Sequence, residues 1–128
     1  MELEKISEEC GVMQNFIETE CGDDPDALIG RLATLNVYLA RSGKLLADVK
    51  KIKDEQTLKV FIENGDWLGS APASTSKAFI NSKIAEINYL VNWLDRINRT
   101  IVHVGDNMRT QLSFIKEELK LTKNGYNP

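Results

Sequence analysis

Five side chains that could hold an anion recur at helical spacing between residues 89 and 103. They comprise two aromatic rings, two guanidinium groups and the only histidine of the chain: Tyr89, Trp93, Arg96, Arg99 and His103. Arginine makes charge-assisted hydrogen bonds to phosphate, and an aromatic ring can stack on a base. The spacing therefore predicts a site for a small anionic ligand or a nucleotide.

The polar residues of this segment follow one another at alternating spacings of four and three, so they would share one face of a helix. This polar line consists of Asn92, Arg96, Arg99, His103, Asp106 and Thr110. Asp106 comes three residues after His103, so we expect its carboxylate to orient the imidazole and to favour its charged form. The alternative interpretation is an ordinary solvated helix face with internal ion pairs.

The sequence lacks the patterns of the common enzyme classes. One histidine and two separated cysteines do not match the spacing of a zinc site, and no Glu-x-x-His pair suggests a di-metal site. A Gly-rich phosphate loop and a Gly-x-Ser-x-Gly elbow are also missing. In one helix Cys10 and Cys21 would lie about 16 Å apart, too far for a disulfide, so we expect both to be reduced. We therefore predict a non-enzymatic protein with no metal and no cofactor.

The composition predicts one domain with a core of its own. The chain has 128 residues, of which 42% are hydrophobic and 27% charged, as is ordinary for a globular protein. No apolar run could span a bilayer, and the acidic start does not resemble a signal peptide. We expect a single helical domain over residues 1–128, a cytoplasmic location and no membrane partner.

The net charge of −3 is unevenly distributed. Residues 1–26 hold nine acidic residues against Lys5, which gives −8, while the other residues hold fifteen bases against ten acids, which gives +5. The acidic segment could dock on the basic body or repel polyanions from it. The alternative is a solvated acidic face on a surface helix.

Apolar periodicity and helix punctuation predict three helices, at residues 3–21, 25–63 and 75–122. Asp24 and Pro25 suit the N-cap and the first position of the second helix. Glycine, proline and hydroxyl residues predict a loop at 64–74 and a frayed tail at 123–128. Within this loop, we expect Trp67 and Leu68 to pack against the helices and hold the loop in place. No strand pattern is present.

The third predicted helix carries one apolar stripe with strict 4,3 spacing. Unbroken from Ser76 to Thr122, it would be about 70 Å long, whereas a compact chain of this size is about 36 Å across. Either it breaks near Gly105 or the molecule is elongated. We expect an all-α, elongated three-helix bundle or helical hairpin, completed by self-association as in a coiled coil. The predicted oligomer seam is Ile87, Val91, Leu94, Asn98, Ile101 and Met108. Asn98 would fix the register between copies, or alternatively bond to a neighbouring helix of the same subunit.

Basic residues on two predicted helices leave binding of nucleic acid open. Lysines cluster near the end of the second helix and arginines lie on the third, but acidic residues are interleaved with both groups. The basic residues are Lys44, Lys50, Lys51, Lys53, Arg96, Arg99 and Arg109. Phosphate contacts by such residues would be sensitive to salt.

The segment from Ser76 to Lys120 resembles the carboxy-terminal helix of small helical proteins carried by bacteriophages and mobile elements. The resemblance implies an accessory factor, such as a recombination helper, an inhibitor of a host enzyme or a protein that sequesters signalling nucleotides. The sequence thus predicts a non-enzymatic helical interaction protein that self-associates and has a possible protein partner. The alternatives are a protein that binds a small anionic ligand or nucleotide, and an accessory protein for nucleic acid.

Overall fold

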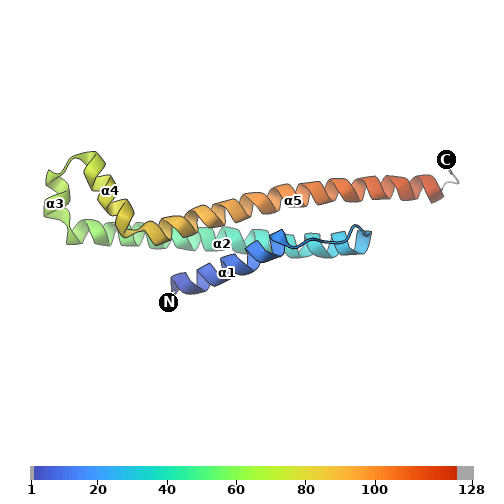
Figure 1. Cartoon of the computed structure of the whole chain (residues 1–128), viewed down its shortest axis with the longest axis horizontal. Helices are drawn as coiled ribbons and strands as arrows, with labels where there is room; N and C mark the ends of the chain where they lie inside the picture. The colour runs from blue at the N-terminus through green and yellow to red at the C-terminus, as the bar shows by residue number, and fades with distance from the viewer. Residues whose placement is uncertain (1, 124–128) are drawn as a thin grey trace.

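The computed structural model describes residues 2–123, and over this range the chain is all-helical. Its helices are α1 (Glu2–Glu18), α2 (Pro25–Glu63), α3 (Gly65–Ser70), α4 (Ala73–Lys83) and α5 (Ala85–Lys123). The predicted all-α class with a long C-terminal helix is confirmed, but this part of the chain has five helices in place of three. The molecule is elongated, and α2 and α5 run antiparallel along it (Figure 1). Residues 124–128 of the predicted tail lie outside the described residues.

The connection between α1 and α2 is held by an arginine. Helix α1 ends at Glu18, three residues earlier than predicted, and Arg31 Nη2 donates to the carbonyl oxygens of Phe16 at 3.0 Å and Ile17 at 3.2 Å. The Phe16 carbonyl also accepts the backbone N–H of Thr19 at 3.3 Å, and the guanidinium adds a second donor at this C-terminal end of α1. Asp24 is the N-cap residue of α2, as expected, but its carboxylate makes no capping hydrogen bond.

The predicted loop at 64–74 is wrong, because most of it is helical. Helix α3 occupies Gly65–Ser70 and α4 begins at Ala73. Leu68 is buried, the Trp67 and Phe79 rings lie 4.9 Å apart, and the hydroxyl of Ser76 donates to the carbonyl of Leu68 at 3.0 Å. The burial of Leu68 and these contacts with α4 stabilise helical turns that glycine and proline alone argue against.

The long C-terminal helix breaks at Ile84 and not near Gly105. Ile84 has φ −112° and ψ 24°, and α4 lies at a steep angle to α5 (Figure 1). Gly105 costs about 1 kcal/mol of helix propensity, but it is buried within α5 and the guanidinium of Arg109 lies beside it. The apolar stripe on both sides of Gly105 is buried, which keeps the helix regular through this position.

The core forms where α1, α2 and α5 meet. Its buried residues are Ile6, Cys10 and Met13 from α1, Leu28, Leu35, Leu45 and Val49 from α2, Ile84, and Ile87, Leu90, Leu94, Ile97, Ile101 and Met108 from α5. The last turns of α5 run past the start of α2 (Figure 1). There Leu119 is 59% exposed.

The predicted oligomer seam is wrong, because α1 and α2 of the same chain cover it. Leu94 is 0% exposed and Ile101 2%, while Ile87 and Met108 are also buried and Val91 packs against the same core. Asn98 Nδ2 donates to Ser42 Oγ at 3.0 Å and to the Leu39 carbonyl at 3.3 Å. The alternative interpretation of Asn98, a bond within one subunit, is the one found.

Among residues 2–123, none of the helices is long and apolar enough to cross a membrane.

Candidate ligand-binding groove between α1 and α5

A surface depression of about 310 Å³ lies where α1 meets the outward side of α5. It is lined by Gln14 of α1 and by Tyr89, Asn92, Trp93, Arg96 and Thr100 of α5. The apolar stripe of α5 faces the core, which leaves these residues on its outer and lateral faces. We call this depression the α1/α5 groove.

The aromatic end of the groove is built on one cross-helix hydrogen bond. Trp93 Nε1 donates to Gln14 Oε1 at 3.0 Å, and Gln14 Nε2 donates to Glu18 Oε1 at 3.3 Å. The Tyr89 and Trp93 rings lie 5.8 Å apart at 56°. Tyr89 is 64% exposed. Trp93 is therefore fixed in place, and Tyr89 presents a ring to solvent beside it.

A second depression of about 420 Å³ adjoins the groove along α5. It is lined by Asp95, Arg96, Arg99, Thr100 and His103, and it shares Arg96 and Thr100 with the α1/α5 groove. The structure thus brings the five residues predicted from spacing into two adjoining depressions. Arg96 and Thr100 lie at their junction.

The charges of this surface are only partly paired. Arg99 Nη2 lies 3.3 Å from Asp95 Oδ2, and both side chains are solvated, so the pair is weak. Arg96 and His103 form no hydrogen bond or ion pair with any residue among 2–123. Arg96 therefore lines the same groove as the two rings, and its hydrogen-bond donors have no partner among the described residues.

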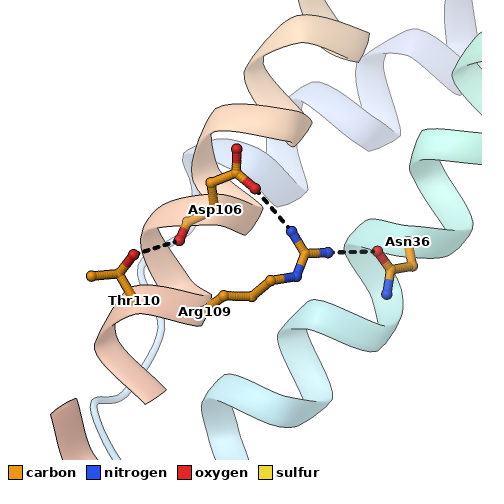
Figure 2. A network of polar contacts seen from close by, with 4 residues as sticks. All are labelled: Asn36, Asp106, Arg109 and Thr110. Carbon is orange, nitrogen blue, oxygen red and sulfur yellow. Dashed lines mark hydrogen bonds and ion pairs between the residues drawn. The ribbon is translucent and has the colours of Figure 1, made fainter. Parts of the chain in front are cut away.

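The expected pairing of Asp106 with His103 is wrong. Asp106 Oδ1 accepts a hydrogen bond from Arg109 Nη1 at 3.1 Å, and Arg109 Nη2 reaches Asn36 Oδ1 of α2 at 3.4 Å. Thr110 Oγ1 donates to the Asp106 carbonyl at 3.1 Å (Figure 2). Arg109 extends toward α2 and binds the carboxylate of Asp106 as well as Asn36. His103 is left without a carboxylate partner among the described residues.

Four residues that line the two depressions were not predicted as ligands: Gln14, Asn92, Asp95 and Thr100. Thr100 lies four residues after Arg96, so the helical spacing that identified the arginines could have found it. Gln14 belongs to another helix, and its place beside Trp93 depends on the packing of α1. The sequence carries no local signal for that contact.

A larger depression, of about 500 Å³, lies between α1 and α2. Glu9 and Arg41 on its wall form a bidentate pair, with Arg41 Nε 2.7 Å from Glu9 Oε2 and Nη2 2.6 Å from Oε1. The hydrogen bond from Arg41 lowers the pKa of Glu9. Because this guanidinium is already bound to a carboxylate, we prefer the α1/α5 groove for an anion.

Within residues 2–123, the Cys10 thiol lies in the core and the side chains that could bind a metal ion are dispersed. Cys10 is buried, and burial together with the nearby charge of Glu9 raises its thiol pKa to about 11. A thiol with so high a pKa is a poor nucleophile at neutral pH. Residues 2–123 contain no cluster of three His, Cys, Asp or Glu side chains that could hold a metal ion.

Comparison of the chain with protein-family models, with curated proteins and with solved structures finds no match to any of them.

Proposed function

We propose that the protein is a non-enzymatic binding protein that holds a phosphate-bearing ligand with an aromatic base, of the nucleotide class, in the α1/α5 groove. The observation that carries this proposal is the position of Arg96. Arg96 lines both depressions, shares the α1/α5 groove with two aromatic residues, and has no partner among the described residues.

Each part of such a ligand has a complement in the groove. The exposed ring of Tyr89, beside the fixed ring of Trp93, offers a stacking surface, and stacking of a base on an aromatic side chain contributes about 1–3 kcal/mol. Arg96 offers the charge-assisted hydrogen bonds that phosphate accepts most strongly. Thr100 adds a hydroxyl donor, and His103 lies further along the same surface.

Binding accounts for this surface better than catalysis. Its side chains supply guanidinium groups, rings and a hydroxyl group, and among the described residues no hydrogen bond joins the Thr100 hydroxyl to the imidazole of His103. The resemblance of residues 76–120 to helical proteins of phages and mobile elements supports an accessory role, and sequestration of a nucleotide would fit it. We place the protein in the cytoplasm, where such nucleotides occur.

A single-stranded nucleic acid is the second candidate, because it presents the same phosphates and bases. The second depression extends the groove along α5 toward Arg99 and His103, which would allow more than one nucleotide to lie on the surface. The two candidates differ in salt dependence, since each additional phosphate contact releases further counterions.

The direct test is thermal unfolding in the presence of nucleoside mono-, di- and triphosphates, pyrophosphate, uncharged nucleosides and single-stranded oligonucleotides. At ten times its Kd, a ligand raises the free energy of unfolding by about 1.4 kcal/mol. For a domain of this size, this corresponds to a rise in Tm of about 4 °C or more. We expect nucleotides to produce this shift and uncharged nucleosides to produce none.

Two matched variants distinguish binding in the α1/α5 groove from a general effect of positive charge. Arg96→Ala removes the guanidinium from the groove, and Lys116→Ala removes a positive charge from an exposed position later in α5. The first should abolish the shift and the second should retain it. Equal loss in both variants, or no shift with any phosphate-bearing compound, would contradict the proposal. A shift seen only with oligonucleotides would favour the second candidate.

A further inference from the structure

Helix α2 exposes an apolar face on the side away from the core. Ile29 is 55% exposed and Val37 is 65% exposed. The exposed residues Gly30, Ala33 and Ala40 lie on the same side of the helix, between and beside these two. We call these five residues the α2 outer face. The buried positions of α2, such as Leu28 and Leu35, point to the opposite side.

The α2 outer face carries no charge. Between Asp26 and Arg41 the only charged residue of α2 is Arg31. Its guanidinium is turned toward α1, where it bonds the carbonyls of Phe16 and Ile17 and lies 4.7 Å from the centroid of the Phe16 ring. A surface helix normally carries charged and polar residues on its solvent side. The α2 outer face therefore has the composition of a packed helix surface without a helix against it in this chain.

The charges at the two ends of the α2 outer face are opposite and equally placed. Asp26 lies nine residues before Leu35, and Lys44 lies nine residues after it. Both lie on the outward side of α2, in line with Ala33 and Val37. The apolar residues 29–40 are centred between the same two charges. In a two-fold contact residue i of one copy meets residue j of the other and the reverse, so opposite charges at equal distances from the axis would meet.

We propose that a second copy of the chain docks on the α2 outer face, with the two α2 helices antiparallel about a two-fold axis near Leu35. In this arrangement Asp26 of each copy lies opposite Lys44 of the other. Gly30 then lies opposite Ala40, and Ala33 opposite Val37. A parallel pairing would bring Asp26 against Asp26 and Lys44 against Lys44. Repulsion between these like charges disfavours it.

The geometry of helix packing restricts the crossing angle. Asp26 and Lys44 lie about 13 Å from the axis along the helix. At a crossing angle of about 20° two helices diverge by about 5 Å at that distance, and at about 50° by about 11 Å. Only the smaller angle keeps each lysine within reach of the opposite aspartate. The small residues Gly30, Ala33 and Ala40 allow the close approach, and no atom outside the local backbone lies within 4 Å of a Cβ built at Gly30.

The contact is short, so the expected dimer is weak. A stable interface buries about 800 Å² on each partner, more than these few helical turns provide. Lys44 is also bound to Asp48 at 2.7 Å within its own chain, although an ammonium group has further donors. We expect a monomer–dimer equilibrium with a dissociation constant in the range of about 10–500 µM.

Sedimentation equilibrium over this range of concentrations tests the proposal, with three sets of variants. Val37→Glu places a charge at the centre of the α2 outer face. The swaps Asp26→Lys and Lys44→Asp each replace two opposite-charge contacts with two like-charge contacts, and the double variant D26K/K44D restores attraction. Lys116→Glu on α5 is the control for a change of charge away from α2. Circular dichroism checks that each variant is helical.

The wild-type chain and Lys116→Glu should dimerise with similar constants. Val37→Glu and each single swap should weaken the dimer by about tenfold or more, and the double swap should return it to near the wild-type value. A wild-type chain that is monomeric at the highest concentration would overturn the proposal, as would a double swap no better than its parents. The α2 outer face lies on the side of α2 away from α5, so these outcomes are independent of ligand binding in the α1/α5 groove.

Discussion

Asn98 of α5 donates a hydrogen bond to the hydroxyl of Ser42 of α2 at 3.0 Å, in the middle of the antiparallel pair. Ser42 is 0% exposed, and its own hydroxyl donates to the Leu39 carbonyl at 3.1 Å. A polar group buried at a helix contact must find its partner there, so this bond fixes the register of α5 against α2. The polar position in the apolar stripe thus serves the fold of one subunit.

Replacement of Asn98 by alanine should lower stability without changing the assembly state. The variant loses the bonds to Ser42 and Leu39, which corresponds to about 1–2 kcal/mol in the free energy of unfolding. Urea unfolding of Asn98→Ala, Ser42→Ala and the double variant would measure the coupling, which we expect at about 0.5–1.5 kcal/mol. Additive effects of the two substitutions would contradict a direct bond.

Arg31 should control the stability of α1 in particular. Arg31→Met keeps a long apolar side chain at this position. It removes the guanidinium, which donates to the carbonyls of Phe16 and Ile17 and lies above the Phe16 ring. We expect a loss of about 1–2 kcal/mol, with faster amide hydrogen exchange in the last turns of α1 than in α5. Arg99→Met, which removes only an exposed pair with Asp95, should change neither. Uniform acceleration of exchange across all helices would contradict a local role for Arg31.

The pair of Glu9 and Arg41 should make stability depend on pH in the acid range. The pKa of Glu9 is below its usual value of 4.5 in the folded protein, chiefly because of the hydrogen bond from Arg41. A lowered carboxyl pKa adds stability above the pKa of the unfolded chain, and this stability is lost as the pH falls through the folded pKa. Both side chains are well exposed, so the contribution is at most about 1 kcal/mol.

Wild type and Glu9→Gln should therefore differ in stability at pH 7 and converge below the folded pKa of Glu9. Urea unfolding at a series of pH values would measure this, and the difference at pH 7 should shrink when salt is added. A difference that is constant with pH would assign the effect of the substitution to packing instead of charge.

Gly105→Ala should stabilise the protein. Alanine is favoured over glycine within a helix by about 0.5–1 kcal/mol. A Cβ at this position would lie 3.4 Å from Arg109 Nη1, the mobile end of a long side chain, so the contact is tolerable. We expect a gain of about 0.5–1 kcal/mol in thermal or urea unfolding. A net loss would mean that the guanidinium between Asp106 and Asn36, drawn in Figure 2, cannot shift to make room.

Much of the fold follows from local patterns. The 4,3 spacing of apolar residues identified α1, α2 and α5, and Pro25 marked the start of α2. The pattern could not say which helix covers the stripe of α5, because a helix of the same chain and one from a second copy bury it equally well. Trp67 and Leu68 were expected to pack onto the helices, but the helical form of α3 depends on its contacts with α4. Similarly, Asp106 had two possible partners along its own helix, His103 and Arg109, and Asn36 on α2 favours Arg109.

The sequence predicted only those residues of the candidate site that lie on one helix, α5. Spacing placed Tyr89, Trp93, Arg96, Arg99 and His103 along α5, whereas the Gln14 side of the groove arose from tertiary packing. The α2 outer face could be identified only from the structure, although its residues are close together in the sequence. Small residues in a helix favour a close approach by a neighbouring helix, and the structure places Gly30, Ala33 and Ala40 of α2 on the solvent side.

The central claim is that the α1/α5 groove binds a phosphate-bearing ligand, and the fluorescence of Trp93 tests it most directly. Trp67→Phe leaves Trp93 as the only tryptophan, at the groove, and replaces a ring that stacks on Phe79 with a similar one. Titration of this variant with a nucleoside triphosphate should give saturable quenching that Arg96→Ala removes. Emission that stays unchanged through millimolar nucleotide, or quenching that persists undiminished without Arg96, would contradict the account.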